Sequence, residues 1–268
     1  GIADRLGYST KAIAHARDPD VLHEKLPLYR IYRDVSAAML PAFIDAKYKR
    51  PLLLIGGVDL LRNAMTRQLE GSETTLDVRA FAPLSRATLS WWFENVQAYV
   101  FKRPELVDQI FDATLGIPLL VGEFARCLQK LPAEDVTAHD LEATLSAFRA
   151  NMHQTAQLLM DGPEAVRLTG RELELLRVIR TVVTEVQSSF DLQDELRVAW
   201  ELCPVAGLQA PFTDERDRIS LQLLMSIGLL PAQKGSCVGT ISELGRVSID
   251  RNSALFDLLA ALGPIDAV

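Results

Sequence analysis

Apolar residues in the first part of the chain follow two patterns. Residues spaced by four between Ile31 and Phe43 predict a helix that leads into the next segment. That segment, Pro51 to Ile55, is an unbroken apolar run typical of a strand covered on both faces, and it ends at Gly56 and Gly57. Glycine lets the backbone approach a ligand, and ligands of open α/β sheets lie at the carboxyl ends of strands. Gly56 and Gly57 are therefore candidate binding residues.

The following segments continue the alternation of helix and strand. A helix is expected from Asp59 to Leu69, and alternating apolar and polar residues from Thr75 to Phe81 predict a second, half-buried strand. Three short helices should come next. Ser85 is a favourable N-cap for the first of them, and Pro104 suits the first turn of the second.

A glycine and a proline separate the second of these helices from the third. Gly116 is expected to end one helix in the left-handed conformation, and Pro118 begins the next helix two residues later. Because the three helices are short and closely connected, they are expected to form a small helical unit of their own.

The rest of the chain is predicted to be helical except near its end. A long amphipathic helix fills the stretch between Pro132 and Gly162, and Thr169 with Glu172 forms a capping box that opens the next helix. Further elements are expected in this order: helices over Asp191 to Leu202 and from Thr213 to Gly228, a β-hairpin of Val238 to Ile241 with Arg246 to Ile249, and a helix over Asn252 to Leu262. The predicted fold is mainly α with a small β component.

Composition bears on the partners of the chain. The 268 residues are 49% hydrophobic, which suffices for real cores, and carry a formal net charge of −7. Because a generally basic surface is missing, nucleic acid is a disfavoured partner. No apolar run approaches the length of a membrane span, so we expect no membrane partner and a cytoplasmic location. The 3 cysteines and 4 histidines lack the spacing of a disulfide framework or a metal site.

The residues that hydrolyse ATP are missing from this sequence. A P-loop needs glycines that present backbone N–H groups to phosphate and a lysine that neutralises it, in the pattern GxxxxGK[ST], and the pattern does not occur. No apolar strand ends in paired acids that could hold magnesium. We therefore predict no catalytic residues and no hydrolysis by this chain alone.

Three segments nevertheless resemble the downstream half of STAND-class and AAA+-like P-loop ATPases, which include the NB-ARC and the bacterial and archaeal regulatory ATPases. They are Leu52 to Gly57, Phe81 to Ser85 with the helix that follows, and Gly116 to Leu120. The first is similar to the sensor-1 strand, and the last to the G-x-P motif, whose proline lies near the adenine. Residues 50–131, about a third of the chain, carry this resemblance.

The resemblance implies a role for each part of the chain. Residues 1–84 would be a partial α/β nucleotide-binding core, residues 85–163 a helical lid and residues 164–268 a winged-helix-like domain. The strand departs from the family pattern, since sensor 1 usually ends in a polar or arginine-containing tip and this strand ends in two glycines.

Five residues would surround the nucleotide by this resemblance: Gly56, Gly57, Arg62, Gly116 and Pro118. Pro118 would contact the adenine and Arg62 would lie on the phosphate side. ATP or ADP would bind only together with elements upstream of Gly1. The implied function is that of a regulatory or assembly module, which couples the nucleotide state to binding of a protein partner or to self-association.

Two other functions compete with this interpretation. In a non-enzymatic helical protein-interaction module, the same motifs would serve only packing, and Trp91 would lie at an interface. A winged-helix DNA-binding regulator ranks lowest, because the helix that would enter the groove begins with acids from Asp214 onward. Residues 166–268 also hold ten Lys and Arg against fourteen Asp and Glu.

Overall fold

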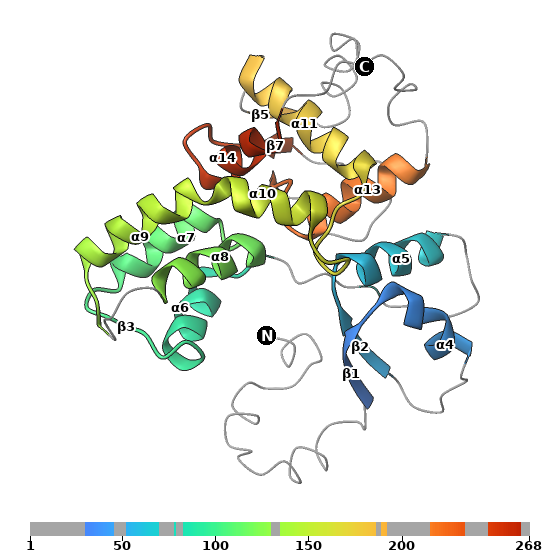
Figure 1. The fold of residues 1–268 in the computed structure, drawn as a ribbon, viewed down its shortest axis with the longest axis horizontal. Coiled ribbons are helices and arrows are strands. Elements are labelled where there is room, and N and C mark those ends of the chain that lie inside the picture. The colour runs from blue at the N-terminus through green and yellow to red at the C-terminus, as the bar shows by residue number, and fades with distance from the viewer. Residues whose placement is uncertain are drawn as a thin grey trace.

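The computed structural model of the chain describes residues 30–45, 52–69, 78, 83–129, 135–185, 189–191, 215–233 and 246–263. Over these ranges the fold is mainly helical with a small β component, as predicted. Figure 1 shows an α/β unit on one side, a group of short helices on the other, and a third group of helices that connects them.

The α/β unit comes first in the chain. Its elements are β1 (Arg30–Val35), the 3-10 helix η1 (Ala37–Met39), α4 (Leu40–Asp45), β2 (Leu52–Gly56) and α5 (Val58–Leu69). The strands run parallel, and α5 packs on them through a small hydrophobic cluster of Val35, Leu40 and Leu60. Both β2 and α5 confirm the predicted strand and helix.

The helix predicted between Ile31 and Phe43 is wrong in its first half. The residues from Ile31 to Val35 belong to β1, and helical structure begins only at Ala37. Residues four apart lie on one face of a strand as well as of a helix, so their spacing does not distinguish the two. Pairing with β2, which a local pattern cannot show, decides in favour of the strand.

The cover of β2 also differs from the prediction. Leu53, Leu54 and Ile55 are half-buried, whereas the apolar run predicted a strand covered on both faces. In the part of the chain that the structure describes, β1 is the only strand beside β2. The remaining predicted strand of this region, Thr75 to Phe81, lies outside the described residues except for Val78.

The second group of elements is helical. It contains α6 (Arg86–Asn95), β3 (Val100–Phe101), α7 (Glu105–Thr114), α8 (Pro118–Leu128), β4 (Asp135–Val136), α9 (Ala138–Ala150) and α10 (Met152–Asp161). As predicted, the Ser85 hydroxyl accepts a hydrogen bond from the Thr88 N–H at the start of α6, and Pro118 begins α8.

The long helix predicted between Pro132 and Gly162 is divided into α9 and α10. The division falls at Asn151, whose φ of −89° and ψ of 2° are not helical. The Asn151 amide also donates a hydrogen bond to the sulfur of Cys127 on α8. Asparagine favours helix ends over helix interiors because its side chain competes for hydrogen bonds, and the apolar spacing alone does not reveal such a break.

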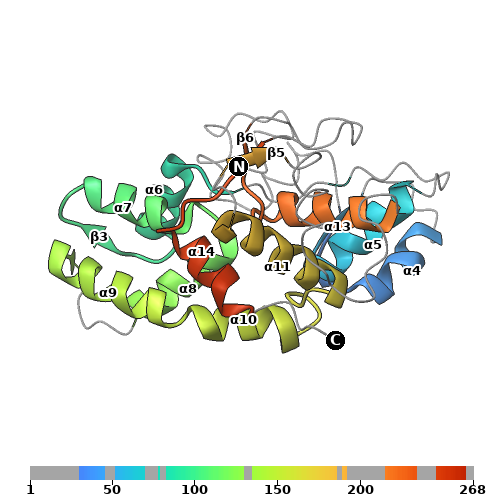
Figure 2. The ribbon, with the colours of Figure 1, turned by 90° about the horizontal axis from the view of Figure 1, so that it is seen from above.

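The third group joins the other two. It contains α11 (Gly170–Glu185), β5 (Ser189–Asp191), α13 (Glu215–Ser226), β6 (Ala232–Gln233), β7 (Arg246–Ser248) and α14 (Ala254–Ala261). The three strands form an antiparallel sheet in the order β5-β7-β6. Seen from above, α13 lies beside α5, and α11 lies beside α14 (Figure 2).

Parts of the predicted C-terminal unit lie outside the described residues. They include the predicted helix beyond its first residue, Asp191, and the predicted strand Val238 to Ile241. Asp191 itself is the last residue of β5. The second predicted hairpin strand is found as β7, whose described partners are β5 and β6. Gly228, with a φ of +85°, lies two residues after the end of α13, in the turn that stops the helix as predicted.

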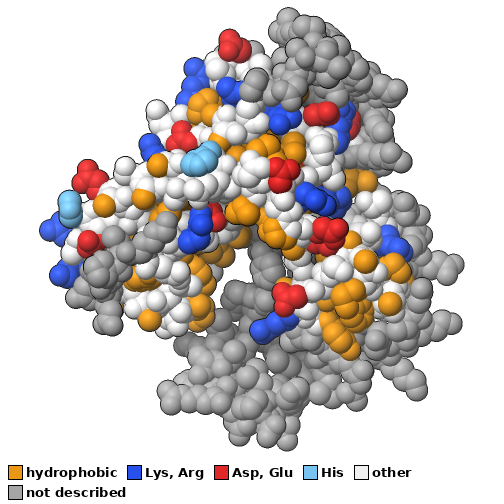
Figure 3. Space-filling model, viewed as in Figure 1, with side chains coloured by type: hydrophobic (Ala, Val, Ile, Leu, Met, Phe, Trp, Pro, Cys, Tyr) orange, Lys and Arg blue, Asp and Glu red, His pale blue; other side chains and the backbone are white. Residues whose placement is uncertain are grey.

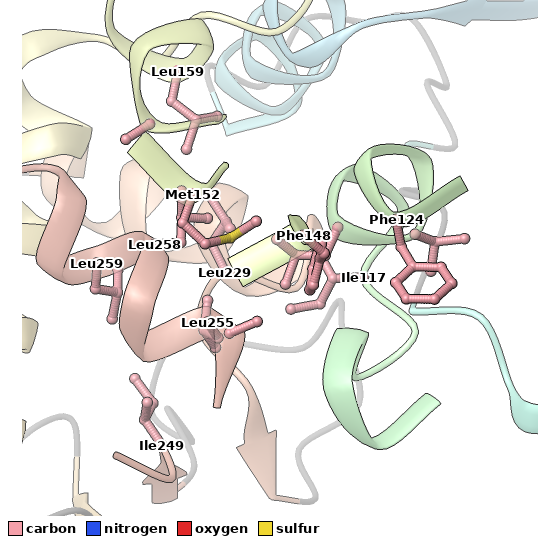
Figure 4. Packing of buried hydrophobic residues seen from close by; sticks show 14 of the residues in the cluster. Ile117, Phe124, Phe148, Met152, Leu159, Leu229, Ile249, Leu255, Leu258 and Leu259 are labelled. Carbon is pink, nitrogen blue, oxygen red and sulfur yellow. The ribbon is translucent and has the colours of Figure 1, made fainter. Parts of the chain in front are cut away.

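One hydrophobic core runs through the second and third groups. In Figure 4, Phe124 and Phe148 lie toward one end of the cluster, Met152 and Leu229 lie in the middle, and Leu258 and Leu259 of α14 lie toward the other end. The Phe124 and Phe148 rings meet edge to face, with their centroids 5.6 Å apart. The helical group and the C-terminal group therefore share one hydrophobic core, which extends across the predicted boundary at residue 163.

Candidate functional site

The carboxyl end of β2 is the first candidate position. A Cβ atom on Gly56 would lie 2.1 Å from the carbonyl oxygen of Val35, and one on Gly57 would lie 2.2 Å from that of Ala165. The Val58 N–H donates to the same Ala165 oxygen at 2.8 Å. The groups that lie close to these two glycines are therefore backbone atoms of this chain.

Arg62 lies one helical turn beyond Gly57 and points to α11. Its Nε donates to Oε1 of Glu172 and its Nη2 to Oε2, both at 2.7 Å, so the pair is bidentate. A further bond from Nη2 reaches the carbonyl oxygen of Arg167 at 3.2 Å. The Glu172 side chain is only 1% exposed. A carboxylate so far from water needs this partner, because removing it would leave a buried charge without compensation.

The same glutamate caps α11. Its Oε2 accepts a hydrogen bond from the Thr169 N–H at 2.8 Å, while the Thr169 hydroxyl accepts one from the Glu172 N–H at 3.3 Å. This is the reciprocal pattern of a capping box, as predicted from the sequence. The negative charge also lies at the positive end of the helix dipole. Glu172 thus stabilises α11 and binds α5 at once.

The neighbouring residue ties α11 to α13. Arg171 donates from Nε and Nη2 to the two carboxylate oxygens of Asp217, at 2.6 and 2.7 Å. Asp217 is 3% exposed. Its hydrogen bonds and charge raise the pKa of the Arg171 guanidinium above its ordinary value. We call the set Arg62, Arg171, Glu172 and Asp217 the charge junction, since it joins α5, α11 and α13.

Gly116 and Pro118 occupy a separate position, between α7 and α8. Gly116 has a φ of +66°, as predicted, and its carbonyl oxygen accepts from the Leu84 N–H at 2.7 Å. Pro118 is exposed at the start of α8. A Cβ atom on Gly228 would lie 3.2 Å from both Ile117 and Pro83. This segment therefore contacts the end of the α13 region.

A cleft of about 790 Å³ lies beside α5. It is lined by Ala37, Asp59, Arg62, Asn63, Thr66, Arg67, Glu164, Arg167, Leu168, Thr169 and Gly170. Arg62 is the one predicted site residue among them, because Gly56, Gly57, Gly116 and Pro118 do not line it. The structure thus brings Gly57 and Arg62 together near α11 and leaves Gly116 and Pro118 at the α7–α8 connection.

Sequence reasoning missed the polar residues of this cleft. Asp59, Asn63, Thr66 and Arg67 follow one another on α5 at intervals of one, three or four residues, which places them on one side of the helix. That polar stripe was a usable signal. Of the facing residues from Glu164 to Gly170, only Thr169 belongs to a sequence motif, the capping box, and only the folded chain brings this segment to α5.

Comparison of the chain with protein-family models, curated proteins and solved structures finds no match. Two further properties concern the described ranges only. No helix there is both long and apolar enough to cross a membrane. No group of three or more His, Cys, Asp or Glu side chains in those ranges could hold a metal ion.

Replacing Arg62 with methionine should destabilise the protein by about 3 kcal/mol, because Glu172 would stay buried without its cation. Replacing Glu172 with glutamine keeps an oxygen for the Thr169 N–H and removes the charge. In the double variant the two losses should therefore not add, and the coupling should reach about 1–3 kcal/mol. Urea unfolding of the four proteins measures this cycle. Additive losses would mean that the pair contributes no stability.

Alanine at Gly57 should also destabilise the protein, by about 1–3 kcal/mol, because its Cβ would overlap the Ala165 backbone. Gly122, within α8, is the matched control, since a Cβ there meets nothing within 4 Å. Gly122→Ala should stabilise the protein by roughly 0.5–1 kcal/mol through helix propensity. Thermal and urea unfolding compare the two. Equal effects would rule out a close-packing role for Gly57.

Proposed function

We propose that this chain is a regulatory or assembly module of a STAND-class or AAA+-like ATPase, which couples nucleotide state to partner binding without hydrolysing ATP itself. The observation that carries the proposal is the charge junction. It connects α5, the helix that directly follows the sensor-1-like strand β2, to α11, and it connects α11 in turn to α13. A change at the end of β2 could therefore reach α11 through α5, and α13 through α11.

The order of elements supports the same proposal. After α11 come β5, α13, β6, β7 and α14, with the strands in an antiparallel sheet, which suits a winged-helix-like domain. The G-x-P-like segment packs through Ile117 near Gly228, so the helical group also contacts this domain. The expected lid and core elements thus each contact the C-terminal unit, through different residues.

The described residues do not form a nucleotide site by themselves. The space beside Gly56 and Gly57 is filled by the backbone at Val35 and Ala165, so these glycines are no open cradle for phosphate. Arg62 is engaged with Glu172. The proposed module acts by a shift between two arrangements, one with the charge junction closed and one with α5 separated from α11. Separation would expose surfaces of both helices to a protein partner.

A non-enzymatic protein-interaction module is the second candidate. Three large apolar side chains near the carboxyl end of α6 are exposed: Trp91 by 58%, Val96 by 54% and Val100 by 58%. Hydrophobic side chains are also visible along the side of the helical group that faces the α/β unit (Figure 3). Exposed tryptophan is favourable at protein interfaces because it buries a large area on contact.

Thermal unfolding with MgATP and MgADP tests the leading proposal. We expect no shift and no hydrolysis for this chain alone, because a P-loop is absent from it. A longer polypeptide that carries this chain together with a P-loop should be stabilised by several degrees, and nucleotide should change hydrogen exchange in α5 and the first turn of α11. The variant Glu172→Gln should weaken this effect of nucleotide on hydrogen exchange. If nucleotide affects neither protein, the ATPase interpretation fails.

Replacing Trp91 with alanine distinguishes the protein-interaction module from the ATPase regulatory module. If α6 forms an interface, self-association measured by sedimentation velocity should weaken at least tenfold, since a buried tryptophan commonly contributes more than 2 kcal/mol to binding. Stability should change by less than about 0.5 kcal/mol because the side chain is exposed. Leu158→Ala, at an exposed position of α10, is the control. Unchanged association by Trp91→Ala would count against the interaction module.

A further inference from the structure

Two arginines of α11 lie side by side where α14 ends. The Arg177 Nε donates to the carbonyl oxygen of Leu262 at 3.1 Å. The Arg180 Nη1 donates to the carbonyl oxygen of the next residue, Gly263, at 3.3 Å. The two arginines are one turn apart on α11, and the α-carbons of consecutive residues are about 3.8 Å apart. The two guanidinium groups are therefore neighbours, and backbone carbonyl groups hold both of them in place.

Neither arginine has an acidic partner. No carboxylate of the described ranges lies within ion-pair distance of either guanidinium group. Glu174, one turn before Arg177 on α11, pairs instead with Arg171, at 3.3 Å. The negative end of a helix dipole carries about half an elementary charge, so α14 offsets only part of two cations. Positive charge is therefore left over here, in a chain whose formal net charge is −7.

The two guanidinium groups keep hydrogen-bond donors that reach the surface. Each arginine gives one N–H to a carbonyl oxygen, and a guanidinium carries several more. Within the pair, only the Arg180 Nε is both buried and without an acceptor. The Nη groups that lack an acceptor are therefore accessible to a ligand. Because the carbonyl contacts already fix both side chains, a ligand that binds these Nη groups costs little side-chain entropy.

Capping of α14 does not by itself explain a pair of arginines. One cation near a helix carboxyl end can satisfy free carbonyl groups and complement the dipole. Near the end of α11 this contact is made by Arg251, whose Nε donates to the Val183 carbonyl oxygen at 2.8 Å. A second cation beside the first adds repulsion. Adjacent arginines are instead favourable for binding phosphate, because each planar guanidinium presents paired donors to its oxygens.

We propose that Arg177 and Arg180 bind a dianionic phosphate monoester, whose oxygens accept hydrogen bonds from Nη groups of both side chains. Its two negative charges match the two cations, whereas a carboxylate matches only one of them. The bound phosphate offsets the repulsion between the guanidinium groups and so strengthens the contact of α11 with the end of α14. The site uses no residue of the charge junction, and it is independent of the proposed nucleotide response.

Isothermal titration calorimetry at constant ionic strength and pH 7.5 tests the proposal. The probes are methyl phosphate, a peptide with one phosphoserine among uncharged residues, and acetate as the singly charged comparison. Both phosphate probes should bind roughly tenfold more tightly than acetate. Equal binding of the two indicates a small ester as the ligand, and tighter binding of the peptide indicates a phosphorylated protein segment. If acetate binds as tightly as methyl phosphate, or if neither phosphate probe binds at millimolar concentration, the proposal is wrong.

Variants assign the binding to the two arginines. Arg177→Gln and Arg180→Gln each keep an N–H for the carbonyl oxygen and remove one charge, so each should weaken binding of methyl phosphate roughly tenfold. The lysine variants at the same positions keep the charge but lose the paired donors. They should bind with intermediate affinity, and they repeat the test should a glutamine variant fail to fold.

Arg149→Gln is the matched control for these variants. Arg149 also donates to a backbone carbonyl oxygen, that of Asn252, at 3.0 Å, and no carboxylate of the described ranges lies within ion-pair distance of it. Its replacement should leave binding of methyl phosphate unchanged. If the variants at Arg177 and Arg180 bind methyl phosphate as tightly as this control does, the site is not at these arginines and the proposal fails.

Discussion

The arrangement of the helices depends on two buried carboxylates, Glu172 in the first turn of α11 and Asp217 in the neighbouring helix α13. Glu172 and Asp217 are 1% and 3% exposed, and each receives a bidentate arginine from a different element. A buried carboxylate without a partner would cost several kcal/mol, so α5 and α13 can lie only where Arg62 and Arg171 reach their acids. The charge junction therefore fixes the α/β unit relative to the C-terminal helices more specifically than apolar packing alone would.

Much of the helical fold was predictable because its signals are local. Ser85 caps α6, Thr169 with Glu172 caps α11, and Gly116 takes the left-handed conformation expected of it. Each signal involves residues within about three positions of one another. The strand β1 and the break at Asn151 were missed for the opposite reason. Pairing with β2 and contact with Cys127 depend on segments that the local pattern does not contain.

The candidate site was predicted only in part, since residue types indicate a contact without its partner. Gly57 signalled a close backbone approach, and the chain fills that space with Ala165, 108 positions away. The resemblance puts Arg62 on the phosphate side of a nucleotide, whereas in the structure its guanidinium is paired with Glu172. Asp217 had counted among the acids that would repel DNA, yet it is buried against Arg171 and adds little to the surface charge. The polar stripe of α5 was visible in the sequence, whereas the residues that face it were not.

The charge junction also constrains how this protein could change shape. Arg62 cannot leave Glu172 behind in the interior, because the carboxylate is buried and also caps α11. An anion that competed for Arg62 alone would therefore meet a large opposing cost. Movement of α5 as a unit is cheaper, since it admits water to Arg62 and Glu172 together while the Thr169 capping box stays intact. Rigid separation of α5 from α11 is thus the physically favoured opening, and a ligand that contacts both would oppose it.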